Sequence, residues 1–450
     1  MAASMNIFFV FFLFNFMPFS ECSRKDIFST KTAYSWIYDI DQNVDKNELM
    51  TTKYNEKHCV AVNAQVMLRH GSRYPGYKDI RKMNNLHKKL KLVVRSPDYD
   101  FLRSWENDFP ESEEKQLVDE GEEEHYALGQ RFGKRLFDLF QESLDSVEFI
   151  SSSKERCIDS AMAFYEGITE TVLHEAYDDL DPKIDDNILR FHEICNNYHD
   201  AVENNRTQMI HHKKFKIQKE MKAVAESLRR RLGIEHAEID AGELKLIYFW
   251  CTFETIILEQ DHWCNLLTDE EKEVIEYHND LKQYWKKAYG HQIIGNMACP
   301  LVKAMFTVLD KTIEDRIQNR TPRGNRAKFY FGHTETLAPL YAALGLFNDS
   351  TPLTDTNFND MKSRVFKSSK ILPFSANLAL VLYKCNYEEE PVPNVEDFVV
   401  QFFVNEQSIK IPVCDDYLCS YKMVRDTYAK HIDQCNFEET CGIKKKHDEL

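Results

Sequence analysis

The stretch Cys59–Pro75, CVAVNAQVMLRHGSRYP, decides the fold and indicates the chemistry. Its first ten residues are mostly apolar or small, which predicts a buried strand, and the strand runs directly into Arg69, His70 and Gly71. In open α/β sheets, ligands bind beyond the carboxyl ends of strands. Two arginines flank the histidine, and guanidinium groups bind phosphate oxygens in a fork, while an imidazole can attack phosphorus. The stretch therefore predicts a strand that ends in a phosphate-binding turn.

Two later segments repeat this arrangement. Ser151–Ser160 (SSSKERCIDS) places Arg156 just after a predicted strand, at the start of a predicted helix. Phe331–Leu337 (FGHTETL) places His333 and Glu335 in the same position, at a helix N-terminus that favours anions. The three strand ends carry Arg-His-Arg, Arg and His-x-Glu. Together they predict a phosphoryl-transfer site.

Hydrophobic periodicity predicts the remaining elements. We expect strands over 59–68, 147–150, 328–331 and 378–383, with a strand or hairpin over 398–411. We expect helices over 120–140, 157–173, 213–231, 270–287 and 299–316, and a further apolar stretch over 244–258. Strand-then-helix units lie at both ends, while 177–289 is mostly helical. The pattern favours an α/β domain assembled from the N- and C-terminal parts, with a helical insertion.

The charge balance narrows the partners. The chain has 450 residues, with 57 Lys and Arg against 73 Asp and Glu, so its net charge is −16. Such a chain is a poor candidate for general nucleic-acid binding, which needs a basic face. The net charge of −16 argues at first against a polyanionic substrate. Chemistry depends on local charge, however, and the arginines at the strand ends reverse that inference. We expect a positive cleft in an acidic surface, with the eight acids of 111–124 in a solvated loop and helix start.

The two ends of the chain indicate a compartment. Residues 7–14 (IFFVFFLF) are too few to span a bilayer, which needs ~20 residues, and fit the core of a secretory signal peptide cut near Ser20 or Ser23. No Lys or Arg precedes this run, and a buried N-terminal strand is the alternative. No later run is long enough to predict a transmembrane segment. The final four residues, His447–Leu450 (HDEL), match an address read by the endoplasmic reticulum (ER) retrieval receptor, so we expect ER-lumen residence, with partial secretion left open.

The twelve cysteines are expected to form disulfides in such an oxidising lumen, although sequence does not give their connectivity. Within the tail, Cys414 and Cys419, and likewise Cys435 and Cys441, are close enough to close small loops. The chain has no C-x-x-C motif and no metal-ligand spacing, so we expect neither a zinc ribbon nor a thioredoxin-type site. Glycosylation is predicted at three sequons, which begin at Asn205, Asn319 and Asn348. Pro322 follows the second sequon and is expected to make it a weaker acceptor.

These motifs together resemble the histidine acid phosphatase branch of the phosphoglycerate-mutase-like superfamily, whose signature is RHG-x-R-x-P. Most acid phosphatases of this branch carry His-Asp in the third motif. Here the third motif is His-Thr-Glu, which is similar to the His-Ala-Glu of the multiple inositol polyphosphate phosphatases and departs from it at Thr334. Further similar stretches are 29–34 (STKTAY), 277–290 (YHNDLKQYWKKAYG) and 331–345 (FGHTETLAPLYAALG). The resemblance covers nearly the whole mature chain.

The resemblance implies an α/β histidine phosphatase fold, with a mixed central sheet flanked by helices and an inserted α-helical cap domain. The expected divisions are a signal peptide at 1–23, a phosphatase domain from 24–176 and 299–443, a cap at 177–298 and an ER-retrieval tail at 447–450. By analogy, Cys59 and Cys385 tie the first strand to the later sheet, and Cys251 could pair with Cys264 within the insertion. Cys157 is expected to be a free, buried thiol. Loss of Cys22 with the signal would leave eleven cysteines, at least one of them unpaired.

The resemblance also implies a metal-independent, cofactor-free phosphatase that hydrolyses inositol hexakisphosphate and lower inositol polyphosphates through a phosphohistidine. It allows 2,3-bisphosphoglycerate as a further substrate. His70 would be the nucleophile, and Glu335 would protonate the leaving oxygen and then activate water. Four residues would hold the phosphoryl oxygens: Arg69, Arg73, Arg156 and His333.

Other cations are candidates for further phosphates of the substrate. Lys78 and Arg81 follow the signature motif and are expected to bind these phosphates. For the remaining lysines both a cleft position and a solvated surface position stay open: Lys31, Lys213, Lys214, Lys216, Lys219 and Lys222.

Three other functions are weighed. Glu335 in place of Asp, together with the ER tail, argues against a general acid phosphatase that acts on simple phosphomonoesters. Against a non-catalytic ER protein on the same scaffold stands the intact set of motif residues, since a degenerate site usually loses at least one. Against a mutase-like transferase stand the helical insertion and the secretory context.

Overall fold

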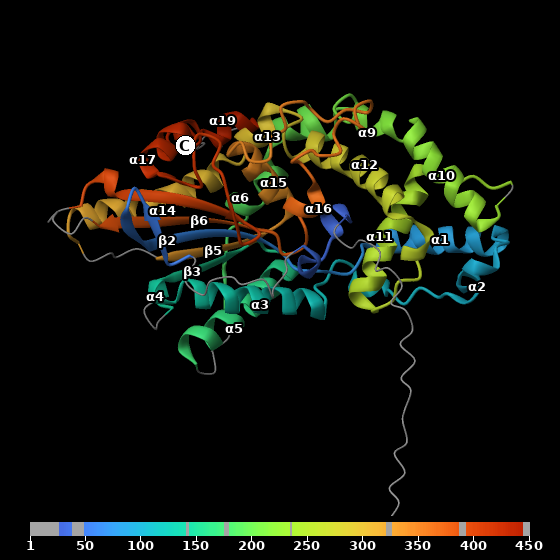
Figure 1. Ribbon diagram of the computed structural model, residues 1–450, viewed down its shortest axis with the longest axis horizontal. Helices are drawn as coiled ribbons and strands as arrows, with labels where there is room; N and C mark the ends of the chain where they lie inside the picture. The colour runs from blue at the N-terminus through green and yellow to red at the C-terminus, as the bar shows by residue number, and fades with distance from the viewer. Residues whose placement is uncertain are drawn as a thin grey trace, which may run out of the picture.

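The computed structural model describes residues 27–37, 49–140, 144–174, 180–234, 236–320, 326–386 and 393–443. Within these ranges, nine strands form one sheet (Figure 1). The path through the sheet runs β4-β3-β5-β2-β6-β7-β8, with β1 paired to β2 and β9 paired to β7. The bounds are β1 (Thr51–Tyr54), β2 (Lys57–Arg69), β3 (Val147–Ser151), β4 (Lys183–Ile184), β5 (Ala327–Gly332), β6 (Asn377–Asn386), β7 (Phe398–Val404), β8 (Gln407–Ile409) and β9 (Leu418–Ser420).

The sheet is mixed, as the resemblance implies. β5 runs parallel to β2 and to β3, whereas β6 runs antiparallel to β2 and β7 antiparallel to β6. β7 and β8 form the expected hairpin, and its turn residues Asn405 and Glu406 both have positive φ. Because β2, β3 and β5 are parallel, their carboxyl ends meet at one edge of the sheet, where Arg69 pairs with Gly332 and Ser151 with Phe331. The three motifs therefore begin side by side.

Helices cover both faces of the sheet (Figure 1). On one face lie α3 (Asp119–Arg135), α4 (Phe137–Phe140) and α5 (Glu155–Leu173); the other face is covered by α14 (Cys299–Ile317), α15 (Thr334–Ala343) and α17 (Tyr421–Thr427). α3 and α5 approach closely because both carry glycine at the crossing. A Cβ on Gly129 would lie 2.1 Å from the carbonyl oxygen of Phe164, and one on Gly167 would lie 2.0 Å from that of Tyr126. Neither position accepts a side chain without moving a helix.

A helical lobe adjoins the sheet. It contains α1 (Tyr77–Val93), α2 (Phe101–Ser104), α9 (Ile210–Phe215), α10 (Lys219–Leu232), α11 (Ala241–Ile257) and α12 (Asp269–Lys287), as Figure 1 shows. The helix expected over 213–231 is broken into α9 and α10. α11 and α12 begin at capping boxes, formed by Asp240 with Glu243 and by Thr268 with Glu271.

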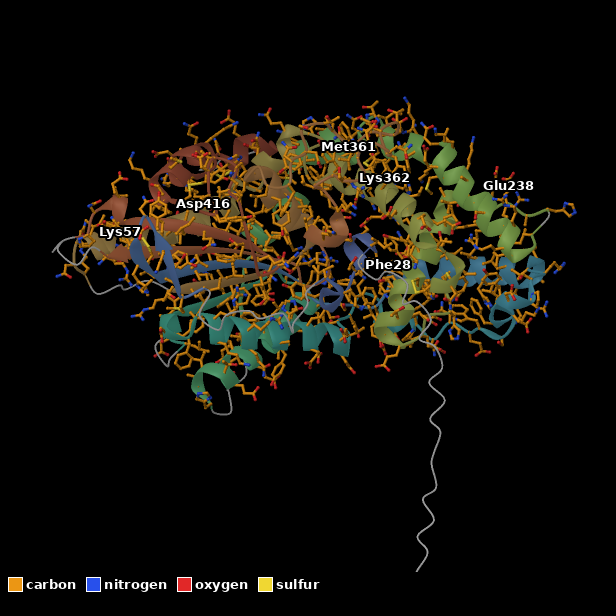
Figure 2. The ribbon with its side chains drawn as sticks, viewed as in Figure 1. Phe28, Lys57, Glu238, Met361, Lys362 and Asp416 are labelled. Carbon is orange, nitrogen blue, oxygen red and sulfur yellow. A yellow bond between two sulfur atoms is a disulfide. The ribbon has the colours of Figure 1, made fainter. Side chains whose placement is uncertain are left out.

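Two segments of the chain build this lobe. α1 and α2 lie outside the predicted insertion 177–298, yet Lys89 of α1 forms a 2.7 Å ion pair with Glu243 of α11. Just after α2, Trp105 donates from Nε1 to Glu254 of α11 at 3.0 Å. The N-terminal segment passes at the junction of lobe and sheet, where Phe28 is buried against Tyr248, with ring centroids 5.1 Å apart (Figure 2). The shorter helices are η1 (Ser29–Lys31), η2 (Tyr34–Trp36), α6 (Asp186–Leu189), α7 (Phe191–Ile194), α8 (Asn196–Tyr198), α13 (Gln292–Asn296), α16 (Ser368–Ile371), α18 (Ala429–Ile432) and α19 (Phe437–Cys441).

Five disulfides are present in the described residues: Cys59–Cys385, Cys195–Cys441, Cys251–Cys264, Cys299–Cys435 and Cys414–Cys419. The first and third are the pairs that the resemblance implies, and Cys414–Cys419 closes a small loop. The prediction that Cys435 and Cys441 close a small loop is wrong. Each of these cysteines bonds across the fold, because α18 packs on α14 and α19 packs on α8. Cys157 is a buried free thiol, and Cys22 lies outside the described residues.

Several predictions for the termini and surface stay predictions. The signal peptide and the tail His447–Leu450 lie outside the described residues. Asn319 and Asn348 are exposed, whereas Asn205 is half-buried and accepts a hydrogen bond from the Thr207 hydroxyl at 2.7 Å. Among the described helices, Gln292–Ile317 alone is long and apolar enough to cross a membrane by composition, and 61% of its 18-residue apolar window is buried inside the protein. Such burial is typical of a core helix.

Candidate active site

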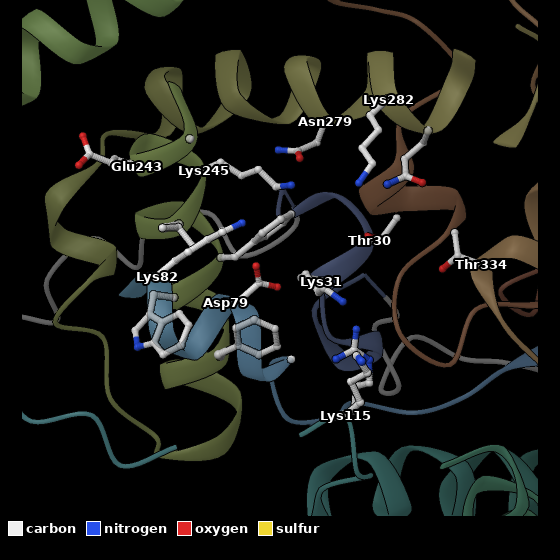
Figure 3. Close-up of a pocket in the computed structure, with 18 of the residues that line it drawn as sticks. Thr30, Lys31, Asp79, Lys82, Lys115, Glu243, Lys245, Asn279, Lys282 and Thr334 are labelled. Atoms are coloured by element: carbon white, nitrogen blue, oxygen red, sulfur yellow. The ribbon is translucent and has the colours of Figure 1, made fainter. Parts of the chain in front are cut away.

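The three strand ends open onto a cavity of about 890 Å³ between the sheet and the helical lobe. Six of the sequence-predicted residues line it together: Arg69, His70, Arg73, Arg156, His333 and Glu335. Figure 3 shows Lys31, Lys82, Lys245 and Lys282 around the same cavity. The structure thus brings residues far apart in the sequence to one place, as the motifs predict.

His70 is held as a neutral imidazole. Its Nδ1 lies 2.9 Å from the carbonyl oxygen of Gly71, which can only accept, so we assign the proton to Nδ1 and the free lone pair to Nε2. Burial, Arg156 and Arg69 together lower the pKa of His70 well below its usual 6.5. The His70 backbone is pinned by two hydrogen bonds, from its N–H to Gly332 and from Ser375 to its carbonyl. An unprotonated, fixed imidazole is the form that can act as a nucleophile.

Gly71 lets the turn pass close to α3. A Cβ at this position would lie 2.3 Å from the carbonyl oxygen of Gly121. The glycine of the motif is therefore needed for the close approach of two backbones, because any side chain would displace the turn that carries His70.

Three arginines next to His70 have no carboxylate partner. Within the part of the chain that the structure describes, Arg69, Arg73 and Arg156 form no ion pair with Asp or Glu. Arg69 donates to the carbonyls of Thr30 and Leu372 at 2.9 and 2.8 Å and stacks on Phe374. Burial and Arg73 lower the pKa of Arg69 to about 9, and burial and Arg156 lower that of Arg73 to about 10. Closely spaced cations that repel one another and form no ion pair with a carboxylate favour the binding of an anion.

His333 caps the N-terminus of α15, and Glu335 lies in its first turn. Burial and Arg156 lower the pKa of His333 to about 3, so its ring is neutral. His333 Nδ1 lies 3.3 Å from Arg156 Nη2, and its Nε2 lies 3.0 Å from the hydroxyl of Ser152. Since a guanidinium only donates, Nδ1 accepts and Nε2 carries the proton.

Glu335 faces the cavity and is ionised. Its side chain is 41% exposed, and its Oε1 lies 2.9 Å from Nζ of Lys287, at the end of α12. Burial alone would raise the pKa of Glu335, but Lys287 and His192 outweigh it and hold this pKa well below the usual range. The carboxylate therefore needs a proton before it can act as an acid.

Glu124 fixes the turn that carries His70 through hydrogen bonds. Its carboxylate accepts hydrogen bonds from the backbone N–H of Tyr34 and Ser72, at 2.9 Å each, and from the hydroxyls of Ser72 and Ser375. The solvated position expected for the acids of 111–124 is wrong for this residue, which is 6% exposed. α3 begins at Asp119 and turns Glu124 inward beneath the motif.

The cavity is strongly cationic. Eleven Lys and Arg side chains line it against four Asp and Glu side chains, although the whole chain carries −16. Burial, Lys245 and Lys287 lower the pKa of Lys282 to about 7. Besides the three motif arginines, the lining cations are Lys31, Lys82, Lys89, Lys115, Lys216, Lys245, Lys282 and Lys287.

Lys78 and Arg81 do not line the cavity, so the structure does not support the expectation that they bind substrate phosphates. Arg81 points away from the cavity and forms an exposed ion pair with Glu111 at 2.8 Å. Lys78 is exposed at the start of α1, against the ring of Tyr77. Of the insertion lysines, Lys216 reaches the cavity, whereas Lys213, Lys214, Lys219 and Lys222 do not; Lys31 reaches it as well.

A periodic signal could have found some of the missed cations. On α1, the lining positions Asp79, Lys82, Leu86 and Lys89 are spaced by three or four residues and so lie along one side of the helix. On α12, Asn279 and Gln283 follow the same spacing. The charges nearest the motif in sequence, Lys78 and Arg81, lie off this face.

Among the described residues, no group of three or more His, Cys, Asp and Glu side chains is arranged to hold a metal ion. The positive charge around this cavity comes from arginine and lysine side chains.

Comparison with known proteins places this site in a family. The model for the histidine phosphatase superfamily (branch 2) matches residues 62–405. The multiple inositol polyphosphate phosphatase 1 of Homo sapiens is 30% identical, over 95% of this chain and 92% of its own length. The Gallus gallus protein of the same name is 32% identical, over 86% of this chain and 85% of its own length.

Two solved structures share the fold. The phytase from D. castellii gives a TM-score of 0.72 at 18% identity, covering 93% of this chain and 88% of that protein. The Bifidobacterium longum multiple inositol polyphosphate phosphatase in complex with inositol hexasulfate gives 0.68 at 17% identity, covering 91% and 98%. With a superfamily model spanning three motifs and curated relatives matching over most of both chains, this chain belongs to the multiple inositol polyphosphate phosphatases, in branch 2 of the histidine phosphatase superfamily.

Proposed function

We propose that the protein hydrolyses the phosphomonoesters of inositol polyphosphates, from inositol hexakisphosphate to lower forms, through a phosphohistidine at His70. The observation that carries the proposal is a neutral imidazole with a free Nε2 beside three arginines that have no carboxylate partner in the described residues. The curated relatives are named for the same activity, and the B. longum protein binds inositol hexasulfate, a polyanionic inositol ring.

The residues divide the reaction between them. His70 Nε2 attacks phosphorus, and Arg69, Arg73 and Arg156 with His333 bind the phosphoryl oxygens and offset the charge of the transition state. Glu335 protonates the leaving inositol oxygen and then helps water attack the phosphohistidine. An acid is needed because an alkoxide is a poor leaving group, and phosphate-monoester hydrolysis is so slow that enzymes accelerate it by up to ~10²¹-fold.

The cationic cavity favours a polyanion over a simple phosphomonoester. Its volume of about 890 Å³ lies within the range of small-molecule sites. Its eight lysines exceed what one phosphate group can contact. In this proposal the helices of 177–298, together with α1, act as a cap that carries six of these lysines, and the other two are Lys31 and Lys115.

The test uses purified mature protein and inositol hexakisphosphate in the presence of a chelator, with products resolved by ion exchange. We expect phosphate release and a series of lower inositol phosphates. Absence of release overturns the proposed substrate. Release that depends on an added divalent metal overturns the metal-independent mechanism.

We also propose that the protein resides in the ER lumen, where the retrieval receptor binds His447–Leu450. The five disulfides indicate an oxidising secretory compartment, and the C-terminal HDEL supports retrieval. Deleting 447–450 should move the protein from the ER into the medium, and an unchanged distribution would contradict retrieval. A mobility shift on deglycosylation that is lost when Asn205, Asn319 and Asn348 are replaced checks the sequons.

A further inference from the structure

The ion pair between Lys287 and Glu335 has a consequence for substrate choice. Both side chains line the cavity, and their charged atoms are 2.9 Å apart. The Lys287 side chain is 13% exposed. Glu335 is therefore paired with a cation that also faces the cavity.

The other cations around Glu335 act in the same direction, whereas Tyr198, whose pKa is raised by burial, stays neutral. Its backbone lies in the first turn of α15, whose N-terminus stabilises a carboxylate. The charged and titratable groups that face it come from the turn after β2, from α7, α8 and α12, and from its own turn: Arg69, Arg73, His192, Tyr198, Lys282, Lys287 and His333. Of these, Lys287 alone is in ion-pair contact with Glu335 among the described residues.

This arrangement conflicts with the role of an acid. A group that protonates the leaving oxygen must carry a proton when the P–O bond breaks, and an ion-paired carboxylate carries none. Something must remove Lys287 from Glu335 before the chemical step. The bound substrate is the source of negative charge that can do so.

We propose that Lys287 is a specificity-determining residue, which holds the carboxylate of Glu335 until a second phosphate group of the substrate takes Lys287 away. The inference rests on the proposed function. A substrate with several phosphates releases Glu335 by binding Lys287, whereas a substrate with one phosphate leaves the ion pair in place. Lys287 thus favours polyphosphates through the chemical step as well as through binding.

The proton balance of the step is simple. Once Lys287 binds the second phosphate, Glu335 takes one proton from the solvent. It passes this proton to the bridging oxygen as the P–O bond breaks and the phosphoryl group bonds to His70 Nε2. The inositol leaves as a neutral alcohol, and Glu335 is again a carboxylate that can take a proton from the attacking water.

Three substrates separate this effect from simple binding. Inositol hexakisphosphate has several phosphates and an alkoxide leaving group, 2-glycerophosphate has one phosphate and an alkoxide leaving group, and 4-nitrophenyl phosphate has a leaving group that departs without a proton. The variants are Lys287→Met and the charge-retaining Lys287→Arg. The matched control is Lys286→Met, since the neighbouring Lys286 pairs with Glu203 at 2.7 Å and does not line the cavity.

The pH profile is the decisive reading. The alkaline limb of kcat/KM for 2-glycerophosphate reports the free enzyme's acid, Glu335. Removing a cation in contact raises the pKa of a carboxylate, so in Lys287→Met this limb should move up by about one pH unit. At pH values above the alkaline limb of both the wild type and Lys287→Met, the ratio of the 2-glycerophosphate rate to the 4-nitrophenyl phosphate rate should then be about tenfold higher in Lys287→Met. For inositol hexakisphosphate the KM should rise severalfold, and Lys287→Arg should keep the wild-type limb.

In the wild type, the alkaline limb of kcat should lie higher with inositol hexakisphosphate than with 2-glycerophosphate, because kcat reports the bound enzyme. The inference is overturned if that difference is absent, or if Lys287→Met leaves the 2-glycerophosphate limb where Lys286→Met leaves it. Equal thermal melts of the variants confirm folding. If the wild type releases no phosphate from inositol hexakisphosphate, the proposed function fails; if it releases phosphate and the limb stays, this inference alone fails.

Discussion

Burial and the neighbouring arginines all lower the pKa of His70. A depressed pKa means that the imidazole stays neutral as the pH falls below 6.5, and is protonated only at a much lower pH. We expect the acidic limb of kcat/KM to lie well below 6.5, which the pH–rate profile of 4-nitrophenyl phosphate measures without involving Glu335 as an acid. An acidic limb near 6.5 that persists across substrates would contradict a neutral, buried nucleophile.

Glu124 is the residue on which the catalytic turn rests. Glu124→Ala leaves two backbone N–H groups and two hydroxyls without their acceptor, which should lower the free energy of unfolding by about 3 kcal/mol. It should also lower kcat, because Ser72 no longer fixes the turn that carries His70. Urea denaturation and steady-state kinetics measure both. The exposed neighbour provides the control: if Glu123→Ala has the same effects as Glu124→Ala, the hydrogen bonds are not the cause.

The motif residues could be predicted from sequence because each follows a strand within a short segment. Glu124 could not, since its four donors come from Tyr34, Ser72 and Ser375, which are brought together by tertiary folding alone. Lys287 lies in the helix that periodicity predicts over 270–287. Its ion pair with Glu335 joins two helices, however, and no local pattern reports such a contact.

At the scale of elements, α1 offers a direct test of which helix face meets the substrate. Lys82 lines the cavity, whereas Lys88 of the same helix is exposed and does not line it. Lys82→Met should raise the KM for inositol hexakisphosphate about fivefold with little change in kcat, because a distal charge contributes binding that is equal in the ground and transition states. Lys88→Met should leave both constants unchanged. A larger effect of Lys88→Met would contradict the placement of the helix.

Strands and helices with clear periodicity were predicted closely, as β2, β6 and the β7–β8 hairpin illustrate. The break between α9 and α10 was missed because the sequence keeps apolar residues at helical spacing across it. There, Gln218 binds the carboxylate of Asp355 and Phe215 packs on Tyr277, so tertiary contacts end one helix and begin the next. The pairing of Cys195 with Cys441 likewise follows from the packing of α8 and α19, which no cysteine spacing reveals.

The whole molecule combines a net charge of −16 with a cavity of opposite sign. Binding of a polyanion to such a cavity depends on electrostatics that salt screens. Between about 50 and 500 mM salt we expect the KM for inositol hexakisphosphate to rise at least tenfold, while that for 4-nitrophenyl phosphate rises much less. A KM for inositol hexakisphosphate that is insensitive to salt would contradict recognition by the cationic cavity.

The central claim is that His70 carries the phosphoryl group during turnover. The most direct measurement mixes the enzyme with radiolabelled inositol hexakisphosphate in the presence of a chelator, quenches in base, in which phosphohistidine survives, and maps the label. We predict label on His70 in the wild type, no label in His70→Ala, and labelling by 4-nitrophenyl phosphate with slowed dephosphorylation in Glu335→Gln. Normal turnover by His70→Ala, or a wild type that turns over without ever carrying label, would contradict the account.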